Sequence, residues 1–155
     1  MGDNHITKCR AKIMRNYFID NGTDLPSEKE IITTFTQNGT GMVVGYTMYN
    51  AMRLTTQISK NIQIYTSALD EQKKQIGNVF LQKYDIVFSP EVVRVVAILE
   101  VLQNYNKIED LNEPQFKKLC AEFAEQYDEK VCEYVLSNIP YSEQTIARLK
   151  AIIGS

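Results

Sequence analysis

Apolar residues recur three or four positions apart along most of the chain, which is the spacing of one face of an α-helix. The pattern covers residues 5–20, and it continues from Met42 to Lys83, where Ser67, a common helix-capping residue, marks a restart. It resumes over residues 112–139 and 142–153. These stretches predict that most of the chain is helical.

The most apolar stretch follows the clearest helix start. Ser89 suits the N-cap, Pro90 suits the first helical position, and Glu91 places a negative charge near the positive end of the helix dipole. Residues 92–102 are then apolar almost without interruption. A helix that is apolar all round is buried on every side, so we predict a central helix over residues 90–105. The β-branched residues would also suit a central strand, but the cap and the length favour a helix.

The stretch from residue 31 to residue 49 allows two interpretations. Ser27 and Glu30 form a capping box, which predicts a helix, and apolar and aromatic residues after residue 41 repeat at helical spacing. Asn38-Gly39, however, lies between two runs rich in Thr, Ile and Val, a pattern typical of a β-hairpin. We favour helices, with the hairpin as the alternative.

The 155 residues match the commonest size of a single domain. No segment repeats at a period typical of solenoids. We therefore predict an all-α fold: a compact single domain over residues 1–155, in which about seven helices pack around the central helix at residues 90–105. The alternative is an α+β fold with a hairpin at residues 31–49.

Composition and charge argue against some classes of binding partner. Hydrophobic residues make up 44% of the chain and charged residues 23%, which are ordinary values for a globular protein. The formal net charge of -2 and the pI of about 5.5 argue against nucleic-acid binding, which needs a positively charged surface. No apolar run is long enough to span a membrane. We therefore expect no nucleic-acid partner and no membrane span.

Cysteine usage indicates the compartment. Cys9, Cys120 and Cys132 are odd in number and include no Cys-x-x-Cys pair. Small secreted domains usually carry even sets of cysteines that pair as disulfides. The first residues also lack the apolar core of a signal peptide. We therefore predict a cytoplasmic protein.

Few residues could support catalysis or hold a metal. His5 is the only histidine, which argues against Ser-His-Asp and Cys-His catalysis and against multi-histidine metal sites. Gly39, Gly41 and Gly45 superficially resemble a dinucleotide-binding loop, but no buried apolar strand precedes them. Residues 20–24 look like a calcium loop, but the glycine and glutamate that an EF-hand needs are missing. We predict no catalytic residue, no cofactor and no metal site.

Arg94 is the candidate ligand-binding or ion-pair residue. It lies inside the most apolar segment, where an unpaired buried charge would cost several kcal/mol. Glu91, three residues earlier, is the acid within reach on the same helix. Three interpretations follow: an ion pair with a carboxylate, a bound anion such as a fatty-acid carboxylate, or exposure on a narrow edge of the helix.

Tyrosines and a row of acidic residues are the candidates for a protein interface. The chain has nine tyrosines and no tryptophan, and tyrosine is enriched at interfaces. Core positions with the hydroxyl at the rim are the simpler interpretation for most of them. The tyrosines that we select as interface candidates are Tyr46, Tyr49, Tyr127 and Tyr134. A row of acids forms either a solvated face or a charged docking surface, and it consists of Glu122, Glu125, Glu129 and Glu133.

These observations favour a non-catalytic helical protein that binds another protein, as an adaptor, inhibitor, immunity protein or chaperone does. Self-association into homo-oligomers stays open. The alternative is a ligand-sensing helical domain whose apolar pocket takes a fatty-acid-like or other anionic small molecule at Arg94. An enzyme is the third interpretation, and it requires at least two acids that converge in a cleft.

Overall fold

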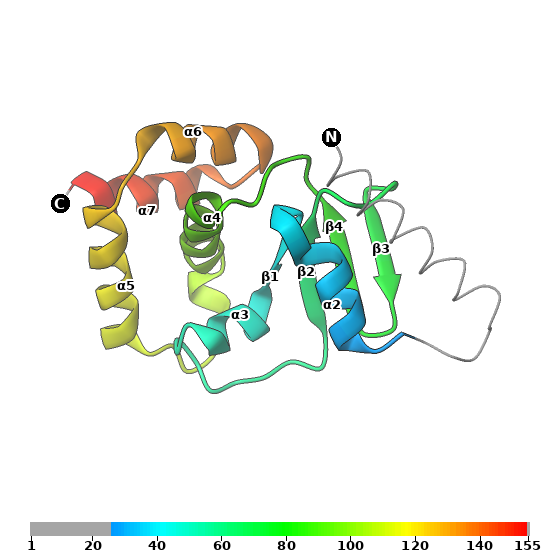
Figure 1. The fold of residues 1–155 in the computed structure, drawn as a ribbon. Coiled ribbons are helices and arrows are strands. Elements are labelled where there is room, and N and C mark those ends of the chain that lie inside the picture. The colour runs from blue at the N-terminus through cyan, green and yellow to red at the C-terminus, as the bar shows by residue number, and fades with distance from the viewer. Residues whose placement is uncertain (1–25, 155) are drawn as a thin grey trace. The chain divides into compact units, whose positions relative to one another are not determined.

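A computed structural model describes residues 26–154 of the chain (Figure 1). Within these residues the chain forms six α-helices and a four-stranded sheet. The fold is therefore α+β, and the predicted all-α bundle is wrong. The predicted helix over residues 5–20, together with His5, Cys9 and the calcium-like residues 20–24, lies outside the described residues.

The chain divides into two compact units. The first, here called the sheet unit, comprises the residues up to Val43 and Lys60–Phe88. The second, here called the helical unit, comprises Val44–Ser59 and Ser89–Ser155. The single domain over residues 1–155 stays a prediction.

The sheet unit combines a helix with a mixed sheet. Its elements are α2 (Glu28–Thr36), β1 (Gly41–Val44), β2 (Ile62–Thr66), β3 (Lys73–Ile76) and β4 (Val79–Lys83). The strands lie in the order β1-β2-β4-β3, with β2 parallel to β4 and β3 antiparallel to β4. Gly77 forms the turn of the β3–β4 hairpin with a φ of 58°, which glycine adopts without strain.

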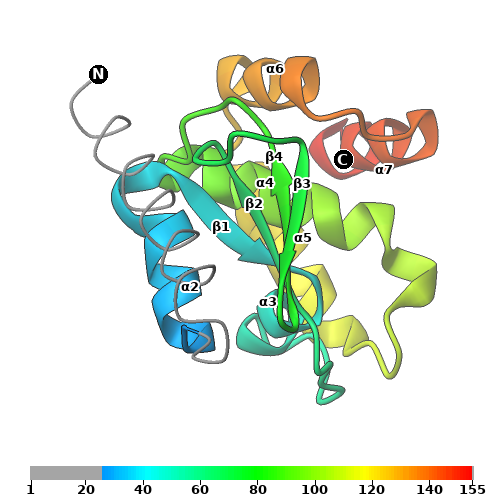
Figure 2. The same cartoon turned by 90° about the vertical axis from the view of Figure 1, so that its right-hand side faces the viewer.

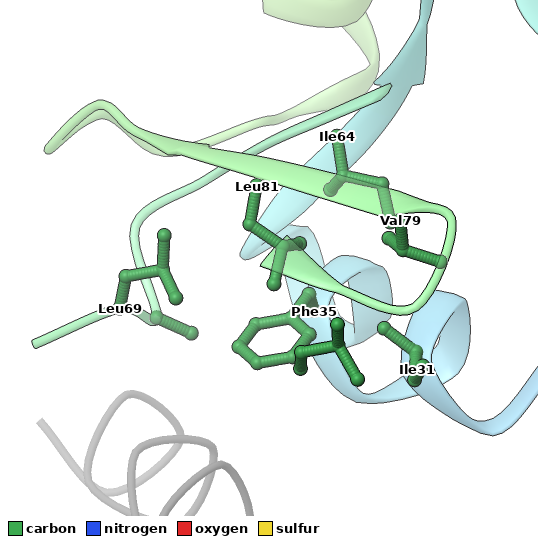
Figure 3. Close-up of a cluster of buried hydrophobic side chains, with 8 residues drawn as sticks. Ile31, Phe35, Ile64, Leu69, Val79 and Leu81 are labelled. Carbon is green, nitrogen blue, oxygen red and sulfur yellow. The ribbon is translucent and has the colours of Figure 1, made fainter. Parts of the chain in front are cut away.

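Alternate strand residues and one side of α2 form the core of the sheet unit. Ile31 and Phe35 of α2 pack against Ile64 of β2 and against Val79 and Leu81 of β4 (Figure 3). All five side chains are at most 3% exposed. Figure 2 shows α2 running along one side of the sheet. Burial of these apolar side chains stabilises the pairing of a short helix with short strands.

The predicted helices between Met42 and Lys83 are wrong, apart from α3 (Gly45–Ala51). In β2 alternate residues are buried, and Ile64 and Thr66 point into the core. This alternation has the period of two that a strand requires. The apolar residues of this stretch are divided among α3, four strands and the loops between them, so their spacing does not mark one face of a helix.

The alternative prediction of an α+β fold is confirmed in its class, but the hairpin that it placed over residues 31–49 is wrong. Both flanks of that stretch are helical, in α2 and α3, and the strand between them, β1, pairs with β2. Asn38 and Gly39 do turn the chain, with φ angles of 56° and 73°. A Cβ added at Gly41 would overlap the carbonyl oxygen of Phe35, so only glycine lets β1 pass this close to α2.

The helical unit packs around the helix that the sequence predicts to be central. Its helices are α3, α4 (Pro90–Gln103), α5 (Glu113–Glu125), α6 (Glu129–Asn138) and α7 (Glu143–Gly154). α4 contacts the other four, and Figure 1 shows α5, α6 and α7 around it. α4 begins as predicted, because the Ser89 hydroxyl accepts a hydrogen bond of 3.3 Å from the backbone N–H of Val92.

The predicted helix over residues 112–139 is interrupted between α5 and α6. Asp128 caps α6, and its carboxylate accepts hydrogen bonds from the backbone N–H groups of Lys130 and Val131 at 3.0 and 3.3 Å. An Asp that binds the backbone in this way favours a helix start over a helix interior. The break lets α5 and α6 pack separately against α4.

Candidate functional site

A groove lies between α4, α5 and α6 of the helical unit, and we call it the α4–α5–α6 groove. Its volume is about 280 Å³, just below the range of about 300–1,000 Å³ that is typical of small-molecule sites. The apolar side chains that line it are Met52, Val95, Ala97, Ile98, Leu119, Phe123 and Val131. The polar ones are Glu91, Arg94, Glu122, Gln126 and Asp128.

The residues at the floor of the groove are more deeply buried than those of its walls. Val95 and Ile98 of α4, which are 4% and 3% exposed, form the floor. Leu119 and Phe123 of α5 and Val131 of α6 are half-buried and form the walls. No residue between Glu113 and Glu125 is fully buried, although apolar residues recur at helical spacing along α5. The described part of the chain therefore covers the apolar face of α5 only in part.

The rim of the groove is predominantly acidic. Glu91, Glu122 and Asp128 are exposed and carry negative charges, and among the lining residues only Arg94 carries a positive charge. Glu91 lies in the first turn of α4 and Asp128 is the N-cap of α6, so both face the positive end of a helix dipole. These two acids are favourably placed for the fold.

Glu122 is placed unfavourably for the fold. It lies with Glu125 in the last turn of α5, and that turn contains no basic residue. The terminal carbonyl groups of a helix carry partial negative charge, which disfavours acids nearby. The C-terminal end of α5 therefore concentrates negative potential beside the groove.

Arg94 lies on the rim of the groove, with an exposed side chain. Among the described residues it forms no ion pair within 4.0 Å, neither with Glu91 nor with another acid. Glu91, Arg94 and the half-buried Ala97 follow one another three residues apart along the edge of α4 that borders the groove. This geometry matches the narrow exposed edge, and a role for Arg94 in ligand binding stays a prediction.

The four candidate tyrosines do not come together at one surface. Tyr49 is 3% exposed, and its hydroxyl donates a hydrogen bond of 3.2 Å to the carbonyl oxygen of Glu100. Burial, and then the nearby Glu100, raise the pKa of Tyr49 well above its usual value. The half-buried Tyr46 packs edge-on against Tyr49, with ring centroids 5.7 Å apart.

The other two tyrosines are exposed. Tyr127 is 37% exposed and Tyr134 is 38% exposed. The ring of Tyr127 lies 6.4 Å from that of Phe123, which lines the groove. An interface role for Tyr127 and Tyr134 stays a prediction, and Tyr127 is the one that borders the groove.

Glu100 is the charged residue that the sequence analysis missed. It is 5% exposed, within α4, and its Oε2 accepts a hydrogen bond of 2.7 Å from the hydroxyl of Tyr141. A helix turns once in 3.6 residues, so a residue nine positions after Glu91 lies on the opposite side of the helix. The sequence therefore contained a signal that Glu100 faces inward if Glu91 faces outward.

Residues 26–154 contain neither a candidate metal site nor a candidate membrane span. No group of three His, Cys, Asp or Glu side chains in this part of the chain could hold a metal ion. None of its helices combines the length and apolar character needed to cross a membrane.

No protein-family model matches the chain, and no curated protein or solved structure is significantly similar to it.

Proposed function

We propose that this protein acts without catalysis, by holding a helix of a partner protein in the α4–α5–α6 groove. The observation that carries the proposal is the half-covered apolar face of α5, which borders a groove with a buried floor. Apolar side chains that form one patch and stay partly accessible are typical of interaction surfaces. Adaptors, inhibitors, immunity proteins and chaperones all act through such surfaces.

A helix suits this groove better than an extended peptide does. The groove is formed by helices, whose backbone groups are paired internally except at the ends, so it offers no strand edge for a peptide to extend. An extended peptide lying over Leu119 and Phe123 would bury its own N–H and C=O groups without partners. A helix satisfies its own backbone and places apolar side chains into the groove at positions i, i+3, i+4 and i+7.

The alternative proposal is a sensor for an anionic small molecule. Arg94 supports it, because a guanidinium at the edge of an apolar groove could bind the carboxylate of a fatty acid. The three carboxylates on the same rim oppose it, because each of them repels an anion. We therefore place protein binding first.

The proposal includes a cytoplasmic location and no cofactor. Cys120 and Cys132 support the location, because both are free thiols. Burial raises the pKa of both thiols, and burial together with Asp128 raises the pKa of Cys132 to about 11. Both side chains are therefore protonated and weakly reactive at neutral pH.

The proposal is tested with a synthetic probe, a fluorescent amphipathic peptide of about four helical turns. The probe carries leucine at helical spacing on one face and glutamine on the other. We expect saturable binding, measured by fluorescence anisotropy. Leu119→Gln should weaken it by making a groove wall polar, whereas Lys118→Gln changes an exposed neighbour outside the groove and should leave it unchanged.

Two outcomes would count against a helix-binding groove. One is absence of binding, and the other is an equal loss in the Leu119→Gln and Lys118→Gln variants. The sensor alternative is tested with laurate in a thermal-shift assay. If laurate raises the melting temperature of the wild type but not of Arg94→Met, the anionic ligand is favoured instead.

A further inference from the structure

Negative charge is concentrated at the junction between α5 and α6. Residues 122–129 contain four acids and no basic residue, and all four acids are exposed. The formal charge of the whole chain is only -2, so this short segment is far more acidic than the rest of the chain. Two of its acids, Glu122 and Asp128, line the α4–α5–α6 groove.

The fold leaves the charges of Glu122 and Glu125 unbalanced. Glu122 and Glu125 are like charges three positions apart on one helix, which repel one another. Both also lie at the negative end of the α5 dipole. No ion pair within the described residues involves either of them. A positively charged partner would relieve both repulsions at once.

The pKa of a nearby side chain responds in part to the acids at the start of α6. Tyr127 lies between Glu125 and Asp128 in the sequence. Desolvation first, and then the nearby Cys132, Glu129, Glu133 and Asp128, raise the pKa of Tyr127 above its usual value.

We infer that the partner helix is basic, with Lys or Arg side chains on the flank that lies against the C-terminal end of α5. This inference rests on the proposed function and specifies the chemistry of the helix that the groove takes. The partner's apolar side chains fill the groove between Leu119, Phe123 and Val131, and its cations lie beside Glu122 and Asp128. An acidic helix is repelled, and a neutral helix gains only the apolar contacts.

The test compares three versions of the leucine probe, which carry lysine, glutamine or glutamate on the polar face. We expect the lysine probe to bind about tenfold more tightly than the glutamate probe at low salt, with the glutamine probe between them. The difference should collapse near 1 M salt, where the Debye length falls to about 3 Å. Fluorescence anisotropy measures all three affinities.

Two charge-reversal variants separate local from overall charge. Glu122→Lys reverses a charge on the rim, and Glu133→Lys reverses an exposed charge of α6 that does not line the groove. We expect Glu122→Lys to weaken the lysine probe and strengthen the glutamate probe. We expect Glu133→Lys to change both much less, although the net charge of the protein changes equally. Circular dichroism confirms that both variants are folded.

The outcomes distinguish this inference from the proposed function. If all three probes bind with equal affinity, the inference is overturned while the groove still binds helices. An equal effect of the two charge reversals also overturns it, because the preference would then come from overall charge. If no probe binds, the proposed function itself fails.

Discussion

The hydroxyl of Tyr141 donates a hydrogen bond of 2.7 Å to Oε2 of Glu100 and so connects the segment before α7 to α4. Glu100 is the one charged residue among the buried side chains of residues 26–154. A buried carboxylate lowers stability unless its oxygens are hydrogen-bonded. The bond from Tyr141 therefore helps the buried side of α4 to accommodate an acid.

Removing this bond should destabilise the protein. Tyr141→Phe leaves the Glu100 carboxylate with one donor fewer, and we expect the free energy of unfolding to fall by about 1.5–3 kcal/mol. Urea denaturation measures the change. Tyr127→Phe removes a hydroxyl from an exposed ring and is the control, expected within about 0.5 kcal/mol of the wild type. Similar losses in the two variants would show that the Glu100 contact is not stabilising.

The floor of the groove also belongs to the core of the helical unit. Ile98 is 3% exposed, so Ile98→Ala should lower the free energy of unfolding by about 2–5 kcal/mol through lost burial and a residual cavity. The matched control is Ile58→Ala, at a side chain that is 84% exposed. Urea denaturation of both variants measures the two free energies of unfolding. A neutral result at Ile98 would mean that α4 is not the centre of this unit.

Glu122, near the C-terminal end of α5, should lower the stability of the fold, although we propose that it favours binding of a basic helix. We expect Glu122→Lys to raise the free energy of unfolding by about 0.3–1 kcal/mol, because it places a cation at the negative end of a helix dipole. Glu129→Lys makes the same change in the first turn of α6 and should lower stability by a similar amount. Thermal denaturation of both variants measures the two changes in stability. A loss of stability in Glu122→Lys would contradict the unbalanced charge described for α5.

Stability should decline at alkaline pH because of Cys132. Its pKa is raised from 9.0 to about 11 in the folded protein, so the folded state holds this proton more tightly than the unfolded state does. The stabilising contribution is therefore complete below pH 9 and is lost as the pH rises toward about 11. Urea midpoints measured across this range should fall more steeply for the wild type than for Cys132→Ala. Parallel pH profiles would rule out a contribution from this thiol.

Helix starts could be predicted from the sequence because their signals are local. Ser89 caps α4 through its own hydroxyl, and Asn112 caps α5 by accepting a hydrogen bond of 3.2 Å from the N–H of Gln115. Both bonds lie within four residues, so neighbouring residue types are enough to reveal them. The break at Asp128 has the same kind of local signal, but it lies within a longer apolar pattern that predicts one continuous helix.

The sheet could not be predicted in the same way, because its partners are distant in sequence. Ile62 pairs with Val79 in the parallel ladder between β2 and β4, and their strands are only five residues long. Apolar residues in so short a segment fit a helix and a strand about equally well. Packing against α2, through Phe35 and Ile31, resolves the choice.

The candidate site was predicted in part. A charge inside an apolar segment makes Arg94 a candidate from the sequence, and the structure places it on the rim of the groove. Leu119, Phe123 and Val131 have the spacing of a buried stripe, whereas the structure places them half-buried on the walls of the groove. Spacing shows which side chains share a face, but it does not show whether another element covers that face.

Amide chemical-shift mapping of the lysine probe on the isotope-labelled protein tests the central claim most directly. We expect the largest shifts at the residues that line the α4–α5–α6 groove, above all Leu119, Glu122 and Val131. The exposed Ile58, outside the groove, should be unaffected. Shifts that gather elsewhere, or no shifts at saturating probe, would contradict the assignment of this groove as a binding site for a basic helix.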